Sequence, residues 1–403
     1  MLSTARPLAL VVTSTLPRWQ NDTEPRFILD LCEALATRYR VRVLAPHCRQ
    51  AARAERFGDV EIHRFRYFAD WGEVLAYDGG ILPKLRQRPW LWVLAPFFML
   101  AQTLALIGEL RREPVALVHA HWLIPQGVVA RVALALSGSR VPLICTAHGA
   151  DVFGLRGGLA RAVQRWVARG CARIGVVSAA LGDELARRGV DRARLRPLPM
   201  GVTLPAAKDT ARDPRLVAFA GRLVEKKGVD VLLDAFALLL RQRPECVLQI
   251  AGGGPEEARL RKQAETLGVG ARVQFLGPVP HERVHALFTA ASVAVMPSTT
   301  AHDGDAEGLG LVMLEAMASA CPVVVSDLPV VRDIVRPGEN ALVFPERDAA
   351  ALAAALQRLL TDRTLAHELS QRARRDVDAA FSWQAVAARH DAAYAEALAA
   401  GEA

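Results

Sequence analysis

The chain has 403 residues, of which 52% are hydrophobic and few are aromatic, a composition that excludes a disordered or fibrous protein and is typical of α/β enzymes. This length is enough for two hydrophobic cores, so two domains are expected. The net charge of +8 is uneven: residues 1–200 carry 28 Lys and Arg against 16 Asp and Glu, a net charge of +12, whereas the remainder carry 22 against 26, a net charge of −4. The basic first half favours an anionic partner such as a phospholipid surface, a lipid diphosphate or an acidic polymer. Nucleic acid is not expected, because no aromatic-plus-basic binding motif accompanies the charge.

Cysteine usage points to a reducing compartment. None of the six cysteines are spaced as C-x-x-C, so the sequence predicts neither a zinc site nor a disulfide framework, and a cytoplasmic location fits best. The first apolar run, residues 8–12, is too short for the core of a secretory signal and no cleavage pattern follows it.

Along the chain, short apolar and β-branched runs alternate with longer helical patterns. In the first half the predicted strands are residues 8–13, 41–45, 60–65, 116–119, 143–147 and 174–178. In the second half they are residues 216–220, 247–251, 273–276, 293–296 and 323–326. This alternation predicts parallel sheets covered on both faces, and two of them in tandem predict two doubly wound Rossmann-like domains facing across a cleft. Ligands of such domains bind at the carboxyl ends of the strands.

Residues 197–214 are rich in proline and small residues and predict the connection between the domains. We therefore expect a first Rossmann-like domain at 1–200 and a second at 201–381. Residues 382–403 predict a helix that begins at Ser382 as its N-cap and packs back on the first domain. Trp383, Val386, Ala387 and Tyr394 fall on one face of it.

Residues 90–107 are almost entirely apolar and approach the length that crosses a bilayer. Pro96 and Gln102 interrupt the run, which continues through Glu109–Glu113 into a predicted strand. We therefore expect a helix buried against a sheet rather than a membrane span.

Residues 158–173 place Arg161, Arg165, Arg169 and Arg173 at i, i+4 spacing, with Trp166 among the apolar residues opposite. Two interpretations stay open. A basic amphipathic helix with a tryptophan can lie in a lipid interface, and an ordinary packed helix can carry a solvated arginine face.

Two polar motifs carry the chemistry. The predicted strand at 216–220 ends at Gly221-Arg222, and Lys227-Gly228 precedes an apolar helix at 229–240, which puts two cations at a strand's carboxyl end. Arginine can grip phosphate oxygens with two parallel hydrogen bonds, and lysine adds a compact charge.

The second motif lies about eighty residues later, where Gly308-Leu309-Gly310 precedes a predicted helix at 311–318. Glycines let backbone N–H groups approach an anion, and a helix start adds positive potential. A phosphate held in this way needs no metal. Glu315, inside the helix, can accept hydrogen bonds from two ribose hydroxyls. Glu307, just before it, can meet a second sugar or stabilise positive charge at its anomeric carbon.

Together these motifs resemble the signature of the family 4 glycosyltransferases, which are retaining, metal-independent enzymes of the GT-B fold. The matching residues are Gly221-Arg222, Lys227-Gly228 and the pair Glu307 and Glu315. Further stretches match family patterns, so that the resemblance covers nearly the whole chain: residues 119–122, 146–151, 250–255, 296–298 and 381–383.

The resemblance implies a role for each matching residue. Arg222 and Lys227 would hold the nucleotide diphosphate, Glu315 the ribose and Glu307 the donor sugar. Gly308, Leu309, Gly310 and Ser298 would add donor contacts. His148, from the first domain, would reach the transferred sugar, and His121, Trp122 and Asp151 are candidates on the acceptor side. The catalytic set is thus Glu307, His148, Arg222 and Lys227, with no metal and no cofactor.

The chain departs from the family at its first loop, where residues 13–25 replace a common Gly-Gly pair, and at Met200, where the family often has asparagine. The first departure points to a distinct acceptor. The resemblance implies transfer of a hexosyl unit from a nucleotide sugar to an acceptor hydroxyl with retained configuration. A lipid-linked or cell-envelope glycan is the favoured acceptor, which would make the enzyme cytoplasmic and peripheral at the inner membrane face, with the anionic membrane surface as a further partner. A small soluble acceptor and a nucleotide-sugar epimerase of the same fold are the alternatives. A dinucleotide oxidoreductase is disfavoured, because Gly252-Gly-Gly254 lacks the required spacing.

Overall fold

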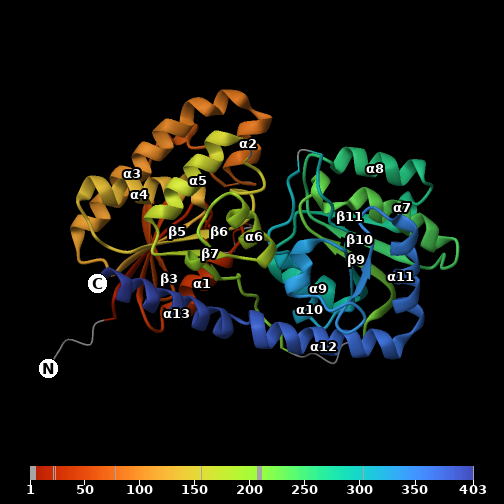
Figure 1. The fold of residues 1–403 in the computed structure, drawn as a ribbon. Coiled ribbons are helices and arrows are strands. Elements are labelled where there is room, and N and C mark those ends of the chain that lie inside the picture. Colours follow the sequence, from red (N-terminus) through yellow and green to blue (C-terminus); the bar gives the residue numbers. More distant parts are fainter. Residues whose placement is uncertain are drawn as a thin grey trace. The chain divides into compact units, whose positions relative to one another are not determined.

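A computed structural model describes residues 6–402 except Asn21, Thr23, Asp78, Arg156, 207–210 and Asp303, so part of the expected connection at 197–214 lies outside the described residues. The chain forms two compact units. The first contains the residues up to Gly201 together with those from Val386 onwards, and the second contains Val202–Ala385 (Figure 1).

The first unit is built on an eight-stranded sheet of order β3-β4-β2-β1-β5-β6-β7-β8. Every strand pairs in parallel with its neighbour except β3, which is antiparallel to β4 at one edge. The helices α3, α4 and α5 lie on one face of the sheet, and α1 and α13 lie on the other (Figure 1). The strands are β1 (Leu8–Val12), β2 (Arg40–Pro46), β3 (Ala54–Phe57), β4 (Val60–Phe65), β5 (Leu117–His121), β6 (Leu143–Ala147), β7 (Arg173–Val176) and β8 (Leu195–Pro197). The helices are α1 (Phe27–Leu35), α2 (Ile81–Gln87), α3 (Leu94–Arg112), α4 (Val128–Ser137), α5 (Gly158–Gly170), α6 (Ala179–Arg187) and α13 (Trp383–Glu402).

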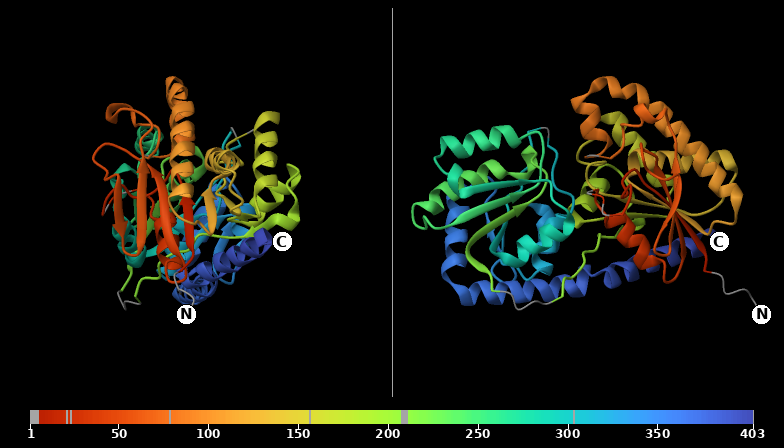
Figure 2. Two further views of the ribbon diagram at one scale, coloured as in Figure 1. Left: turned by 90° about the vertical axis from the view of Figure 1, so that its left-hand side faces the viewer. Right: turned by 180° about the vertical axis from the view of Figure 1, so that it is seen from behind.

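The second unit has a six-stranded sheet of order β11-β10-β9-β12-β13-β14, and all its strands run parallel. The helices α7, α8 and α11 cover one face, and α9, α10 and α12 the other (Figures 1 and 2). The strands are β9 (Asp213–Ala220), β10 (Val247–Ala251), β11 (Val273–Gly277), β12 (Ala291–Met296), β13 (Val323–Ser326) and β14 (Leu342–Phe344). The helices are α7 (Val229–Leu240), α8 (Glu257–Thr266), α9 (His281–Ala290), α10 (Leu311–Ala318), α11 (Ala349–Thr361) and α12 (Arg363–Phe381).

Two doubly wound parallel sheets confirm the predicted fold class, and every predicted strand is present. Three short strands escaped prediction: β3, β8 and β14. Each lies at the edge of a sheet, where one partner suffices and no long apolar run is required. Strand β3 reads Ala-Glu-Arg-Phe and is half-exposed, so neither periodicity nor burial marks it in the sequence.

Both sheets have a switch point, where the winding direction of the chain reverses. In the first unit it lies between β1 and β5, and in the second between β9 and β12. The loops that leave two strands on either side of a switch point turn to opposite faces, which opens a crevice at their carboxyl ends. The crevice of the second unit is therefore bordered by Gly221-Arg222 after β9 and by Pro297-Ser298 after β12.

The last helix is fastened to the first unit by buried polar contacts. Tyr394 of α13 pairs with Nδ1 of His119 on β5 at 2.8 Å, and Tyr39 donates to Asp391 at 2.9 Å. Glu396 accepts from Arg173 at 2.6 Å and from Arg196 at 2.9 Å. Ser382 begins the helix as expected, since its Oγ accepts from the N–H of Ala385.

A single arginine closes the ends of two helices in the second unit. The guanidinium of Arg212 donates to the carbonyls of Phe288, Thr289 and Ala291 at the end of α9. It also donates to the carbonyls of Ser319 and Ala320 just after α10, at 2.8 and 2.7 Å. Carbonyls at a helix C-terminus have no partner within the helix, and a cation there also complements the helix dipole. Arg212 therefore holds α10, which carries Glu315, in a set position next to α9.

We predict that Arg212→Met lowers the free energy of unfolding of the second unit by about 2 to 3 kcal/mol, because it leaves several carbonyls without their charged donor. Calorimetric unfolding, which resolves the transitions of the two units, measures the effect. Arg215→Met is the matched control, since Arg215 is exposed and pairs only with Asp213 two residues away among the described contacts. Equal melting temperatures for the two variants would contradict the assigned role.

Candidate active site

The loops after β9 and β12 are joined through their backbones. The N–H of Thr299 donates to the carbonyl of Lys226 at 2.8 Å, and its hydroxyl donates to the carbonyl of Glu225 at 3.3 Å. Gly228 makes this approach possible: its φ is +61°, and a Cβ there would lie 1.9 Å from the carbonyl oxygen of Pro297. Only glycine fits at such a contact. The two motifs that the sequence separates by about eighty residues thus meet at the switch point.

The centre of the site is an ion pair between Lys227 and Glu307. Next to it, Lys226 pairs with Asp305 at 3.1 Å and donates to the carbonyl of Ala306. Burial by itself raises the pKa of the Glu307 carboxyl, but Lys227 and Lys226 outweigh burial and lower the pKa to about 2. Glu307 therefore stays ionised at neutral pH, and the site holds two lysines beside a permanent negative charge.

The helix α10 starts at this ion pair. Gly310 precedes it with a left-handed φ of +78°, a conformation that glycine adopts without strain. A small pocket collects Lys227, Ser298, Glu307 and Gly310, with an apolar wall from Met296, Val312, Met313, Val330 and Val331. Gly308 lies buried next to this pocket. Leu309 is a core residue with 5% exposure, so its side chain is not available to a ligand and only its backbone remains for the contact that the resemblance implies.

Arg222 and Glu315 lie on the same unit, outside that pocket. Arg222 is exposed directly after β9. Glu315 lies on α10 with 14% of its side chain exposed, and one carboxylate oxygen is 3.7 Å from Nδ1 of His281 at the start of α9. His281 in turn contacts His285, ring nitrogen to ring nitrogen, at 2.9 Å. The expected donor residues Arg222, Lys227, Ser298, Glu307 and Glu315 all follow or adjoin the two strands at the switch point.

The segment before Glu307 is held from two sides. The carboxylate of Glu225 accepts from the N–H of His302 at 3.0 Å and pairs with its ring. The carboxylate of Glu346 accepts from the N–H of Thr300 at 2.6 Å, and Arg347 donates to the Thr300 carbonyl at 2.8 Å. These contacts join the backbones of Thr300 and His302 to side chains that follow β9 and β14.

The first-unit candidates gather at the ends of β5 and β6. His121 ends β5, and its Nδ1 lies 2.9 Å from Nε2 of His148, which follows β6. The ring of Trp122 lies 4.8 Å from that of His148, and Phe27 adds a third aromatic ring at 5.6 Å. Asp151 is fully committed to the backbone among its described contacts, because its oxygens accept from the N–H groups of Leu123, His148 and Gly149. It positions the loop of His148 rather than presenting a carboxylate to a ligand.

Both histidines are neutral at physiological pH. Burial lowers the pKa of His148 to about 3, with His390 adding to the effect, and burial lowers the pKa of His121 well below its usual value. A neutral imidazole can donate or accept one hydrogen bond at each nitrogen but brings no charge. Nε2 of His121 is buried without a described hydrogen-bond partner.

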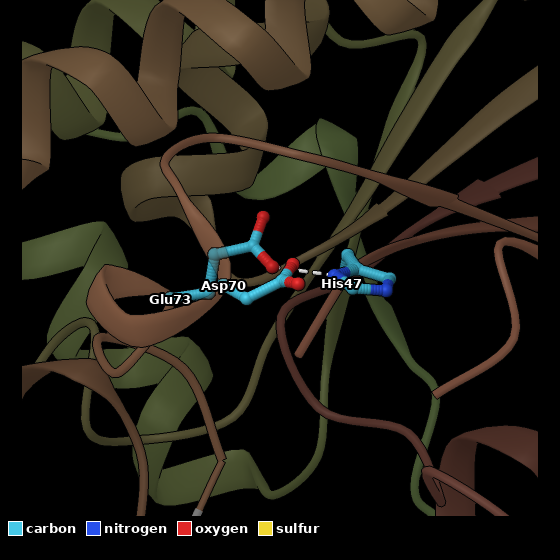
Figure 3. A group of neighbouring side chains, drawn as sticks. All are labelled: His47, Asp70 and Glu73. Atoms are coloured by element: carbon cyan, nitrogen blue, oxygen red, sulfur yellow. Dashed lines mark hydrogen bonds and ion pairs between the residues drawn. The ribbon is translucent and has the colours of Figure 1, made fainter. Parts of the chain in front are cut away.

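Within the described residues, one group has the spacing of a metal site: His47, Asp70 and Glu73 (Figure 3). Both of its carboxylates already have partners, since Arg66 pairs with Asp70 and Glu73 and His47 bonds to Glu73. The N–H of Tyr67 donates to the same glutamate. These contacts are those of a loop-closing network, and the group belongs to the first unit, whereas Lys227 and Glu307 belong to the second.

Sequence reasoning did not identify Lys226, Glu225 or the apolar wall as parts of this site. Lys226 lies next to Lys227 and could have been chosen from its charge. Val330 and Val331 come from a short turn after β13. No local pattern marks them, because only the strand order brings β13 beside β12.

Comparison with known proteins assigns the two halves separately. Residues 25–205 match the family model described as Glycosyltransferase Family 4. Residues 203–376 match the model described as Glycosyl transferases group 1. The two matches meet at the boundary between the units.

Curated relatives include a glycogen synthase of Mycobacterium tuberculosis, 32% identical over 67% of this chain. That match spans 66% of the relative, so this chain covers just under two thirds of its length. A GDP-mannose-dependent alpha-(1-6)-phosphatidylinositol monomannoside mannosyltransferase of the same organism is 32% identical over 66% of this chain and 72% of its own.

Among solved structures, the sucrose-phosphate synthase of Thermosynechococcus elongatus superposes with a TM-score of 0.78 at 24% identity, over 98% of this chain and all of the other. Anabaena Alr3699/HepE, solved in complex with UDP and glucose, gives a TM-score of 0.72 at 17% identity over 96% and 99% of the two chains. At such identities the likeness carries the fold alone. With the fold, both family matches and the mannosyltransferase relative in agreement, this chain belongs to the family 4-like glycosyltransferases of the GT-B fold.

Proposed function

We propose that the protein transfers a hexosyl unit from a nucleotide diphosphate sugar to an acceptor hydroxyl, with retention of configuration and without a metal or cofactor. The observation that carries the proposal is the Lys227–Glu307 pair at the start of α10, on the edge of a switch-point crevice. It places a cation for a diphosphate next to a permanent carboxylate for a sugar.

The diphosphate would lie against Arg222, Lys227 and the first N–H groups of α10. As the bond between the anomeric carbon and the diphosphate breaks, negative charge builds on the departing oxygen, and these groups stabilise it. The acceptor oxygen bonds to the anomeric carbon on the same face, and its proton passes to the leaving phosphate. Positive charge that develops on the sugar would be stabilised by Glu307, which is ionised whenever the enzyme works. Lys226 and Lys227 pair with the acids of this region and Arg222 directly follows β9, so the proposal uses these cations in place of a metal ion.

His148 would contact the transferred sugar through a hydrogen bond. Its pKa of about 3 keeps it uncharged, so it would not repel the developing positive charge. His121, 2.9 Å away, would set which nitrogen of His148 carries the proton.

A nucleotide sugar as donor is supported by the relatives' names: one is GDP-mannose-dependent, and Alr3699/HepE was solved with UDP and glucose. For the acceptor, the proposal is a lipid-linked or cell-envelope glycan at the inner membrane face, with the enzyme cytoplasmic. The phosphatidylinositol monomannoside mannosyltransferase and the basic first half of the chain favour it. The glycogen synthase and sucrose-phosphate synthase relatives keep a soluble acceptor as the second candidate.

We predict that Lys227→Ala lowers kcat by roughly 10²- to 10³-fold, the usual cost of removing one preorganised group that stabilises transition-state charge. Initial rates with a panel of UDP-, GDP- and ADP-sugars measure this. Lys262→Ala, on the exposed surface of α8, is the control that removes a lysine without touching the site. Near-native turnover by a folded Lys227→Ala enzyme would refute the diphosphate assignment.

We also predict that Glu315 reads ribose hydroxyls. In the unmodified protein, UDP or GDP should raise the melting temperature more than the matching 2′-deoxynucleotide, since only a ligand that binds the folded form stabilises it. In the Glu315→Gln variant, the ratio between the affinities for the nucleotide and for its 2′-deoxy counterpart should fall roughly tenfold. The reason is that the amide accepts hydrogen bonds at one oxygen instead of two. An unchanged affinity ratio in the Glu315→Gln variant would show that the ribose binds elsewhere.

An epimerase of the same fold remains distinguishable. It would convert a donor sugar with no acceptor present, whereas a transferase requires the acceptor for anything beyond slow hydrolysis. Donor turnover followed by NMR without acceptor therefore separates the two functions.

A further inference from the structure

The outer face of α3 and of the turn before it is apolar and exposed. Its large residues are Trp90 (63% exposed), Trp92 (56%), Val93 (67%), Phe97 (49%), Leu100 (58%) and Leu104 (59%), here called the α3 face. From Val93 they recur at positions 93, 97, 100 and 104, which is the spacing of one stripe along a helix. Figure 2 shows α3 running along the outside of the first unit.

The segment Pro89–Arg112 is long and apolar enough to cross a membrane by length and composition, yet a third of its most apolar window is buried. Its inner face is part of the fold: Phe98 and Leu106 are buried, and Gln102 donates to the carbonyl of Thr13. Glu109 is bonded to Arg42 at 3.1 Å and to His63 at 2.7 Å. A membrane-spanning helix would have to break these contacts. Helix α3 therefore covers the sheet, as predicted, and no described residue covers its outer stripe.

The aromatic end of the stripe extends beyond α3. Phe97 contacts Phe68 at 6.0 Å between ring centroids, and Phe68 contacts Trp71 at 5.3 Å. Trp71 is the most exposed tryptophan of the described residues at 77%. Three exposed tryptophans thus gather at one end of an aliphatic stripe, and tryptophan is the residue enriched at the boundary between lipid headgroups and acyl chains.

Positive charge predominates around the α3 face, and the exposed acid beside Trp71, Asp70, pairs with Arg66. Residues 79–108 contain no Asp or Glu but include Lys84, Arg86 and Arg88, and the stripe ends at Arg111 and Arg112. The nearest acid of the helix, Glu109, is used by Arg42 and His63. Cations at both ends of an apolar stripe complement anionic headgroups above acyl chains. They would repel the same cations on a second copy of the chain.

We propose that the α3 face docks on the surface of an anionic lipid bilayer, with Trp71, Trp90 and Trp92 at headgroup level and the Phe97–Leu104 stripe in contact with acyl chains. The protein lies on the membrane and does not span it. This inference rests on the proposed function in one respect: docking would place the enzyme at the membrane that holds its lipid-linked acceptor. The docking itself involves neither donor nor acceptor.

The basic helix α5, the other candidate for a lipid contact, lacks a free arginine row. It ends at Gly170, so Arg173 belongs to β7, where it is bonded to Glu396 of α13. Arg165 donates to the carbonyl of Arg188, and Arg131 stacks on the ring of Trp166 at 4.1 Å. The predicted single face of four arginines is therefore divided between α5 and the sheet.

The test is binding of the full-length protein to vesicles of phosphatidylcholine with and without phosphatidylglycerol, by co-sedimentation. The stripe variant Phe97→Ser, Leu100→Ser, Leu104→Ser should lower the partition coefficient by roughly 10- to 100-fold. Arg88→Gln with Arg111→Gln should weaken binding several-fold on phosphatidylglycerol vesicles at low salt and leave phosphatidylcholine vesicles little affected. All five residues are exposed, so near-native melting temperatures are expected.

Leu159→Ser with Trp166→Ser on α5 is the matched control, since both residues are exposed and apolar in the same unit. This pair should bind vesicles like the unmodified protein. Brominated acyl chains should quench tryptophan fluorescence in the unmodified protein and less in Trp90→Phe with Trp92→Phe.

Three results would overturn the proposal. One is unchanged vesicle binding by the stripe variant, and the second is loss of binding in the α5 pair instead. The third is a dimer that sedimentation velocity detects in the unmodified protein and not in the stripe variant. That result would show that the α3 face binds a second copy of the chain. Resistance of the bound protein to carbonate extraction would overturn the claim that it does not span. Normal donor turnover by a stripe variant that no longer binds vesicles would be consistent with the transferase assignment. Inactivity of Lys262→Ala or activity of Lys227→Ala would contradict the transferase assignment without affecting the docking proposal.

Discussion

The donor side of this protein depends on one constraint, the ion pair between Lys227 and Glu307. Two loops that leave strands β9 and β12 must meet for it to form, and they meet because Gly228 lets the first press against the carbonyl of Pro297. The pair then keeps a buried carboxylate ionised, since the nearby lysines lower its pKa to about 2 against the effect of burial. A lysine and an ionised carboxylate, which we propose for the phosphate and the sugar of the donor, are thereby held side by side at the start of α10, where helix N–H groups add to the positive potential.

In the first unit, burial and backbone hydrogen bonds rather than an ion pair determine the state of the candidate residues. Its histidines are neutral through burial, Asp151 is consumed by backbone N–H groups, and aromatic rings surround His148. Charged side chains lie both inside this unit, where Arg42 and Arg64 pair with glutamates, and on its surface, where Arg88 and Arg111 flank the exposed stripe of α3. The second unit thus holds a charged pair at its switch point, whereas the distinctive feature of the first unit is an apolar and cationic exterior. That division agrees with the sequence, in which the second half resembles its family closely and the first departs from it at residues 13–25.

Prediction from sequence succeeded where a structural element is defined by residues that are close together in the chain. The strand at 216–220, the helix at 229–240 and the helix at 311–318 are present at the expected positions, because apolar periodicity and flanking glycines define them locally. It failed where roles depend on distant partners. The arginine row at 161–173 is split because Arg173 starts β7 and is bonded to Glu396, 223 residues later. The apolar run at 90–107 does cover a sheet as expected, but which of its side chains remain exposed depends on how the helix is rotated against β2 and β4.

The sequence by itself determined the fold class and the family, and it supplied the residues proposed for the donor side, because motif spacing and strand–helix alternation are properties of the chain. Only the tertiary structure decided which of those residues touch. Strand order places β12 beside β9, and this brings Lys226 to Asp305, Lys227 to Glu307 and two valines from beyond β13 into one pocket. It also decided that α3 turns one face inside, where Gln102 and Glu109 are bonded, and one apolar face outside. Contacts between residues far apart in the chain depend on the packing of the sheets, which no local pattern records.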